Sequence, residues 1–257
     1  MWITYAVVAL LGVIFGSFAS AVAHRAPRGE SFTTERSCCP SCGHVLGVMD
    51  LFPIISWLWL RGKCRYCQAQ FGVKYIALEI TMALLFVMVF YRYGMSGVTP
   101  LVWGIVFCMV LVVLWEQQTM TIPYGMVLII LGLSIVAHIA YGTSWYSPLT
   151  GGVIGVVAGG VFWQGGRWLQ KKQQPPLIGR ETIALLGSIG VFLTQYGIVS
   201  YLVWAGILTM LHPVAARRWQ VFSMNAVLSV LFVVWLLWPE INHQTNGLIT
   251  NFTLFLR

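Results

Sequence analysis

Long apolar runs separated by short polar breaks fill most of this 257-residue chain. At 1.5 Å per residue, most of these runs are long enough for a helix to cross about 30 Å of hydrocarbon. The pattern therefore predicts an α-helical polytopic membrane protein with about eight transmembrane helices. We expect the helices near residues 2–23, 76–93, 98–115, 122–141, 150–169, 182–196, 198–212 and 220–238.

The first run has a cleaved signal peptide as its alternative interpretation. It lacks a basic stretch before the apolar residues, and it is longer than the apolar core of a typical signal peptide. We therefore expect it to remain as a transmembrane helix.

Composition agrees with a membrane protein. Hydrophobic residues make up 58% of the chain and charged residues only 9%, whereas soluble domains carry roughly 25% charged residues. So few charges could not cover the surface of a soluble protein of this size. A soluble globular enzyme, a disordered chain and a secreted disulfide scaffold are excluded.

A polar stretch over residues 24–75 interrupts the apolar pattern and contains five of the six cysteines. We call it the cysteine module. The predicted organisation is a first transmembrane helix at 1–23, the cysteine module at 24–75, a membrane helix bundle at 76–240 and a C-terminal tail at 241–257.

The distribution of basic residues predicts the orientation in the membrane. With the cysteine module in the cytoplasm, 13 of the 15 Lys and Arg residues lie on that side, as the positive-inside rule requires. The N-terminus is then outside. This orientation explains the net charge of +8 without nucleic acid as a partner, since no basic face on a soluble domain is visible. The predicted partner is the lipid bilayer.

Two C-x2-C motifs in the cysteine module predict a zinc site. Tight turns at Cys39/Cys42 and Cys64/Cys67 would bring four thiolates around one ion, which makes the zinc structural because no open position remains. A disulfide pair is the alternative, and a cytoplasmic location disfavours it. The remaining candidates, which we expect not to be ligands, are Cys38, His44 and Cys108.

A series of short motifs surrounds this module over residues 12–82. They are Gly16-Ser17-Phe18, Arg25-Ala26-Pro27, Asp50, Pro53, Ser56-Trp57-Leu58, the run from Arg61 to Cys67, Tyr75 and Glu79. The series resembles the N-terminal half of the type IV prepilin peptidases, the bifunctional leader peptidase/N-methyltransferases.

The resemblance implies a protein of the bacterial inner membrane that serves pilus assembly or type II secretion. Its members cleave the basic leader of type IV prepilins or pseudopilins on the cytoplasmic face. They then methylate the new N-terminus with S-adenosylmethionine. Two aspartates carry out the proteolysis in this family.

The second half of this chain departs from the family at both aspartates. Glu116 stands seven residues before Pro123, where the first aspartate is expected. Gly179 aligns with the second, and Glu181 follows two residues later. An aspartyl peptidase needs one ionised and one protonated carboxyl around a water, and Asp50 is the single aspartate of the chain. The candidate catalytic pair is therefore Glu116 and Glu181.

Each glutamate also has an ordinary interpretation. Glu116 could be an interfacial carboxylate at the end of a span, and Glu181 an acid that favours the helix dipole. A second hypothesis for the chain is therefore a catalytically inactive relative that binds prepilins or pilus assembly components. A transporter or channel is a third, disfavoured because paired acids deep within the spans are absent.

The methyltransferase activity has no readable motif of its own, since no G-x-G-x-x-G follows a strand. Possible contributors are Glu79, Arg61, Lys63 and Arg65. The alternative interpretation is that these charges anchor the module to the membrane surface.

Overall fold

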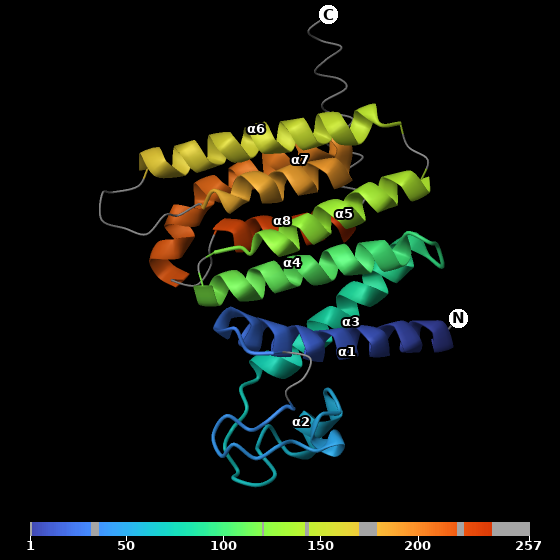
Figure 1. The fold of residues 1–257 in the computed structure, drawn as a ribbon, viewed down its shortest axis with the longest axis vertical. Coiled ribbons are helices and arrows are strands. Elements are labelled where there is room, and N and C mark those ends of the chain that lie inside the picture. The colour runs from blue at the N-terminus through green and yellow to red at the C-terminus, as the bar shows by residue number, and fades with distance from the viewer. Residues whose placement is uncertain are drawn as a thin grey trace, which may run out of the picture. The chain divides into compact units, whose positions relative to one another are not determined.

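The computed structural model describes residues 2–31, 36–119, 121–141, 144–169, 179–219 and 224–237. These residues are mostly helical (Figure 1), and β-pairing among them is limited to two isolated bridges, Cys38 with Val45 and Lys63 with Gln70. The chain divides into two compact units, Met1–Met95 and Ser96–Arg257. The predicted C-terminal tail at 241–257 lies outside the described residues.

The first unit consists of a helix pair and the cysteine module. Helix α1 packs against α3, and two glycines make the close approach possible. A Cβ atom on Gly12 or Gly16 would collide with the backbone of Ala83 or Glu79. The elements are α1 (Trp2–Arg25), η1 (Ala26–Arg28), η2 (Val48–Asp50), α2 (Ile55–Trp59) and α3 (Lys74–Tyr93).

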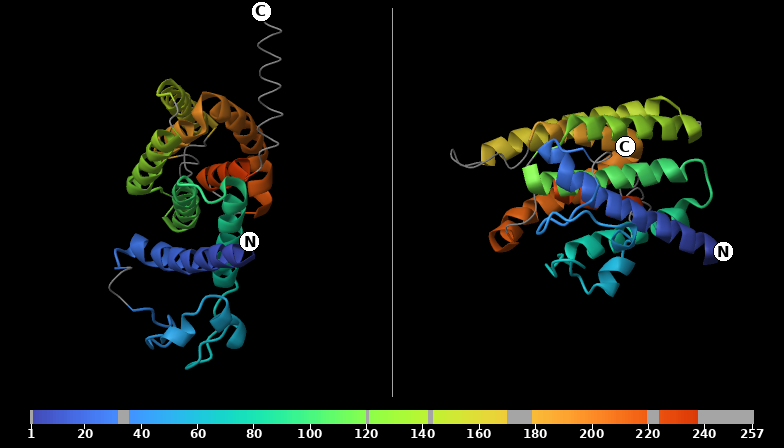
Figure 2. Two further views of the ribbon diagram at one scale, coloured as in Figure 1. Left: turned by 90° about the vertical axis from the view of Figure 1, so that its right-hand side faces the viewer. Right: turned by 60° about the horizontal axis from the view of Figure 1, so that its bottom comes forward.

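The second unit is built around four helices that contact one another in a ring. Helix α4 packs against α5 and α8, α7 also packs against α5 and α8, and α6 covers α7 (Figures 1 and 2). Fully buried apolar side chains such as Ile105, Ile130 and Phe232 fill the interior. The bounds are α4 (Thr99–Thr119), α5 (Tyr124–Tyr141), α6 (Tyr146–Leu169), α7 (Glu181–Trp219) and α8 (Met224–Leu237).

Glycines spaced four residues apart hold α6 close to α7. A Cβ atom on Gly151, Gly155 or Gly159 would collide with backbone atoms of α7, at Gly190, Leu186 and Ile183 respectively. Small residues at this spacing allow the backbones of membrane helices to approach closely. The glycine-rich stretch is therefore a packing surface, as its sequence indicates.

A sharp break interrupts α7 at Thr194, whose φ of 63° lies outside the helical region. The two predicted spans at 182–196 and 198–212 thus form one helical element with a kink. His138 of α5 lies at this break, with its Nε2 atom 2.8 Å from the carbonyl oxygen of Val191. Because a carbonyl only accepts, Nε2 carries the proton and donates to a carbonyl beside the kink.

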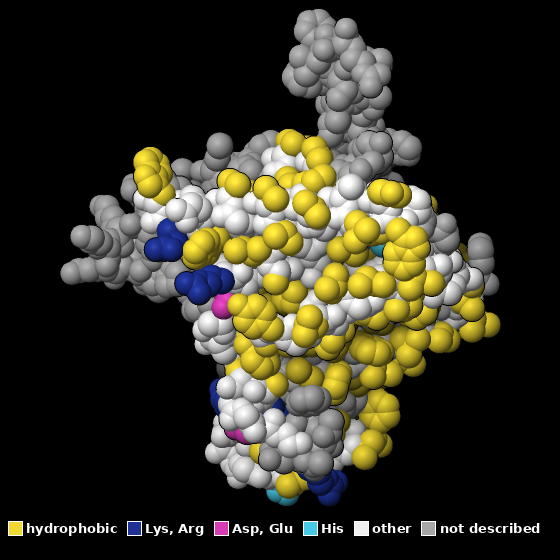
Figure 3. All heavy atoms as spheres, turned by 45° about the horizontal axis from the view of Figure 1, so that its top comes forward, with side chains coloured by type: hydrophobic (Ala, Val, Ile, Leu, Met, Phe, Trp, Pro, Cys, Tyr) yellow, Lys and Arg dark blue, Asp and Glu magenta, His cyan; other side chains and the backbone are white. Residues whose placement is uncertain are grey.

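Four of the described helices are long and apolar enough to cross a membrane. They cover Trp2–Arg28, Lys74–Tyr93, Thr99–Thr119 and Tyr146–Trp168, and two shorter apolar helices cover Tyr124–Ala140 and Glu181–Thr194. Figure 3 shows apolar side chains over most of the visible helical face. The helical membrane protein is confirmed, whereas the count of eight spans stays a prediction.

Candidate metal centre and carboxylate sites

The two C-x2-C motifs form turns of the same design. The N–H of Gly43 donates to the carbonyl of Cys39, and the N–H of Gln68 donates to that of Cys64, at 2.8 and 3.1 Å. Gly43 and Gln68 take φ values of 69° and 60°, the left-handed conformation that closes such turns. These closures direct the thiols of each motif toward the other motif.

The structure brings all four predicted ligands together. The Sγ atoms of Cys39, Cys42, Cys64 and Cys67 lie within 4.8 Å of one another. The Cys39 and Cys67 sulfurs are 3.8 Å apart, and a tetrahedral site with Zn–S bonds of about 2.3 Å requires about this separation. All six cysteines are free thiols in the structure, so the disulfide alternative is not supported.

The neighbours that were expected not to be ligands stay outside the cluster. Cys38 is exposed, and Cys108 is buried within α4. The His44 ring stacks on Tyr66 with a centroid separation of 3.6 Å, which explains its position without a metal.

Two thiols of this cluster have pKa values shifted in opposite directions. Hydrogen bonds from the backbone of Cys42 and then of Ser41 lower the pKa of Cys39 to about 6. A backbone hydrogen bond at Ala69 lowers the pKa of Cys67, but burial and the neighbouring thiols raise it more, to about 12. A dication would stabilise the four thiolates together, so the donor set fits zinc.

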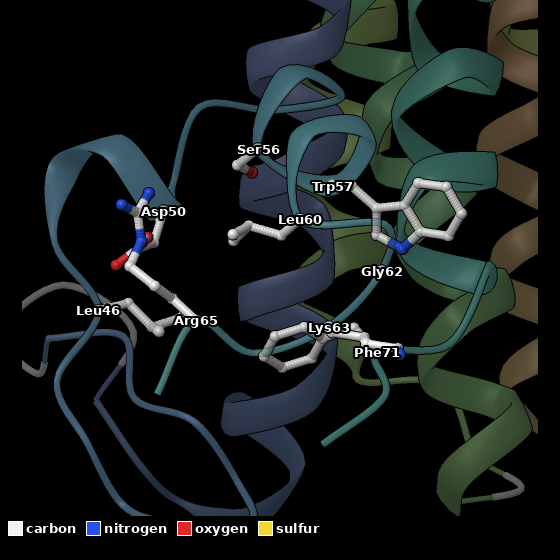
Figure 4. A pocket seen from close by; sticks show the side chains of 9 residues that line it. All are labelled: Leu46, Asp50, Ser56, Trp57, Leu60, Gly62, Lys63, Arg65 and Phe71. Carbon is white, nitrogen blue, oxygen red and sulfur yellow. The ribbon is translucent and has the colours of Figure 1, made fainter. Parts of the chain in front are cut away.

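Asp50 lies in the same module, on one side of a pocket of about 40 Å³ (Figure 4). Its carboxylate accepts from Arg65 Nε at 2.7 Å and from the N–H of Gly47 at 3.2 Å. This pocket is far smaller than the roughly 300 Å³ of the smallest ordinary ligand pockets. It does not fit S-adenosylmethionine, and we assign no residue of this chain to the methyl donor.

Glu79 is buried in α3 and holds the loop that leads into α2. Its Oε2 atom accepts a hydrogen bond of 2.7 Å from the backbone N–H of Ile54. Ile54 has a φ of 62°, which is rare for a β-branched residue and persists only where the surroundings impose it. Sequence reasoning noted Glu79 but missed this contact, because nothing local predicts which backbone group a carboxylate accepts from.

Glu116 and Glu181 occupy helix ends in the second unit. Glu116 is 3% exposed in the last turn of α4, and Glu181 is the first residue of α7. The end of α4 and the start of α7 lie at the same end of this unit, on the left of Figure 1. Their participation in a single site stays a prediction.

The Glu181 side chain folds back over Gly179. A Cβ atom placed on Gly179 would collide with Oε2 of Glu181, so the carboxylate fills the space of a side chain at position 179. No sequence pattern would have revealed this position, since it depends on the turn between the two residues. Asp50, by contrast, belongs to the cysteine module of the first unit.

Comparison with known proteins agrees with the motifs. Residues 10–93 match the family model of the bacterial peptidase A24 N-terminal domain. The prepilin leader peptidase/N-methyltransferase of Aeromonas salmonicida (strain A449) is 28% identical over 187 residues, 62% of each chain. That of Burkholderia pseudomallei (strain K96243) is 27% identical over 219 residues, 75% of this chain and 69% of the relative.

A third relative matches a shorter part of the chain at higher identity. The prepilin leader peptidase/N-methyltransferase of Myxococcus xanthus (strain DK1622) is 41% identical over 85 residues, 33% of this chain and 25% of its own. The chain matches about three fifths of the length of the Aeromonas salmonicida relatives. No solved structure matches the chain. The resemblance is confirmed: the chain is similar to prepilin leader peptidase/N-methyltransferases, and its residues 10–93 match the model of the bacterial peptidase A24 N-terminal domain.

Proposed function

We propose that this chain processes type IV prepilins or pseudopilins at the bacterial inner membrane, in pilus assembly or type II secretion. Its relatives are named for leader cleavage and N-methylation, and the cysteine module would face the cytoplasm, where prepilin leaders lie. The N-terminus would be outside, and the membrane bundle would contain about eight spans. The basic residues support this orientation through the positive-inside rule.

The position of the Glu181 carboxylate carries the peptidase proposal. Family aspartates provide two carboxyls, and Gly179 stands where the second is expected. Because the Glu181 carboxylate fills the side-chain space of Gly179, its extra methylene and its shift of two residues offset each other. Glu116 would supply the other carboxyl from the end of α4, where it is buried.

The reaction follows from two carboxyls in different protonation states. The ionised carboxyl takes a proton from a water, whose oxygen bonds to the carbonyl carbon of the leader peptide. The protonated carboxyl donates its proton to the carbonyl oxygen. When the C–N bond breaks, the first carboxyl gives the proton it took from water to the amine nitrogen, and the second recovers a proton from a hydroxyl of the intermediate. The products are the carboxyl end of the leader and a new N-terminus. The resemblance implies that S-adenosylmethionine would be the methyl donor for this amine.

Zinc would have a structural role in this function. Four thiolate ligands leave no position for a catalytic water, and a module of this size gains its stability from such an ion. Cys39, Cys42, Cys64 and Cys67 would hold it.

A catalytically inactive relative is the second candidate function, and one observation favours it. The single aspartate, Asp50, is held by Arg65 in the cysteine module and is therefore unavailable to a dyad. Such a protein would bind prepilins or pilus assembly components without cleaving them.

Cleavage of a prepilin in membranes that contain the full chain separates the two functions. Wild type, Glu116→Gln and Glu181→Gln are compared, with the mass of the pilin N-terminus as the readout. The matched control is Glu30→Gln, at an exposed acid of the module. A glutamate peptidase loses cleavage in the first two variants and keeps it in the control.

Two other results decide against the glutamate peptidase. Cleavage that survives both substitutions contradicts the carboxyl pair. A prepilin that co-purifies with every variant but stays uncleaved supports the inactive relative. A methylated product with wild type would show that the second activity is present.

A further inference from the structure

The stretch Val48–Leu60 of the cysteine module, here called the wedge, exposes apolar side chains that a water-soluble loop would bury. Trp59 is 82% exposed, Val48 73% and Met49 71%. The remaining exposed apolar side chains of the wedge are Leu51, Phe52, Ile55 and Leu58. A contiguous apolar surface of this kind marks contact with a protein or a membrane.

Helix α2 within the wedge has two apolar faces. Ser56, Trp57 and Leu60, the residue that follows α2, line the pocket of the module (Figure 4). Ile55, Leu58 and Trp59 lie on the opposite face, and all three are exposed. One face thus packs within the module, while no described residue covers the other face.

The hydrogen bond between Ile54 and Glu79 places the wedge beside a membrane span. Glu79 lies five residues inside α3, which is about 7.5 Å beyond Lys74 at 1.5 Å per residue. The same turn of α3 contacts Gly16 of α1, nine residues before that helix ends at Arg25. Ile54 is therefore held by a residue that lies inward of the charged ends of both apolar helices.

The other end of the wedge returns to the start of the span. The N–H of Phe71 donates to the carbonyl of Gly62 at 2.6 Å, and α3 begins three residues after Phe71. The chain between Ile54 and Gly62 thus runs from a contact with a residue inside α3 to a contact with a residue that precedes α3. A re-entrant segment would follow such a path.

The backbone of this path is compatible with an apolar environment. In hydrocarbon every N–H needs an internal acceptor. Ile54 donates to Glu79, and Ser56 and Leu58 donate to the carbonyls of Phe52 and Ile54. Leu60, Arg61 and Gly62 donate to carbonyls of α2. The wedge therefore satisfies these donors without water.

Charges and aromatic groups flank the wedge as they do at a membrane interface. Arg61, Lys63 and Arg65 follow it immediately, and all three are exposed. Basic side chains beside apolar and Trp residues favour the headgroup region of an anionic leaflet.

We propose that the wedge inserts into the leaflet in which α1 ends and α3 begins, with Met49, Leu58 and Trp59 among the acyl chains. The module would then be held at the membrane by its own apolar surface, in addition to the two helices. This inference is independent of whether the glutamates cleave a peptide.

Photocrosslinking in a bilayer tests the proposal on the full chain. Benzoylphenylalanine replaces Trp59 or Met49 in protein reconstituted into nanodiscs of phosphatidylethanolamine and phosphatidylglycerol. Both positions are highly exposed, so the larger side chain fits without repacking. After irradiation, phospholipid adducts are counted by mass spectrometry of the labelled peptide.

Two matched positions calibrate the yield. Leu84 of α3 is 58% exposed in the middle of an apolar span and serves as the lipid-facing control. Gln68, exposed in the second cysteine turn, serves as the water-facing control. We expect yields at Trp59 and Met49 that match Leu84 and exceed Gln68 by about tenfold or more. Yields equal to those at Gln68, or adducts to protein in place of lipid, would overturn the proposal.

Discussion

Asp50 and Arg65 are joined by an ion pair of 2.7 Å inside the cysteine module. The aspartate side chain is only 5% exposed, whereas that of the arginine is 47% exposed. Asp50 also accepts from the Gly47 backbone, so it fastens the η2 turn to the second cysteine turn. The single aspartate of the chain is thus part of the module's architecture.

Asp50→Asn should destabilise the module while leaving the peptidase chemistry unchanged. Loss of a charge-assisted hydrogen bond at a buried carboxylate costs about 1.5 to 3 kcal/mol. Limited proteolysis should cut residues 36–73 faster in the variant than in wild type, with Glu30→Gln as the control. A variant that keeps a resistant module but no longer cleaves prepilin would place Asp50 in the catalytic machinery.

Removal of the metal should unfold the same module. Purified protein is expected to contain one zinc per chain, and a strong chelator or Cys64→Ser should remove it and expose the module to protease. Cys38→Ser is the matched control, since this exposed thiol lies outside the cluster. Elemental analysis measures the zinc content of both variants. Equal zinc contents in Cys38→Ser and Cys64→Ser would contradict the zinc site.

A carboxylate exchange tests whether Glu181 replaces a side chain at position 179. Gly179 has space for a side chain once the Glu181 side chain is truncated. In the Glu181→Ala background, which removes both the carboxylate and its volume, Gly179→Asp should restore part of the lost cleavage. The gain should stay below wild type, because a misplacement of about 1 Å can cost a hundredfold in rate.

The control for this exchange is Gly179→Asn in the same background, which fills the space without a charge. Activity is compared as the initial rate of leader removal at equal protein levels. Equal rates for the Asp and Asn variants would show that a carboxylate at this point does not take part in cleavage.

The glycine contact between α6 and α7 should tolerate no added methyl group. Gly155→Ala places a Cβ against the backbone of Leu186 and should cost about 1 to 3 kcal/mol through overpacking. Gly160→Ala has no atom within 4 Å of the added Cβ and should be neutral or slightly stabilising. Apparent melting temperatures in detergent compare the two; equal shifts would mean that α6 is not held by this contact.

The sequence predicted the features that repeat along the chain, and local spacing explains why. Apolar runs predicted the helices, and the two C-x2-C motifs predicted the cluster at Cys39, Cys42, Cys64 and Cys67. The glycine-rich run at 150–169 indicated close packing, which the contact with α7 explains. Each of these features depends on residues near one another in sequence.

Features that depend on distant parts of the chain were not predicted. At the Thr194 break the chain receives a hydrogen bond from His138 on another helix, and a threonine carries no signal for positive φ. The contact between Glu79 and Ile54 joins residues 25 positions apart. The sequence places the apolar wedge within the polar cysteine module, because charged residues surround it. Its position beside α3 depends on the contact between Glu79 and Ile54.

The two cysteine pairs lie on either side of the wedge, at Cys39/Cys42 and Cys64/Cys67. An ion held by both pairs would close the intervening chain into a ring that includes the wedge, and would fix both ends of that ring. Metal depletion would open this ring and leave the apolar wedge without its cross-link in a newly made membrane protein. Quality-control proteases would degrade such a protein. The abundance of the protein in the cell would then follow the zinc status of its host.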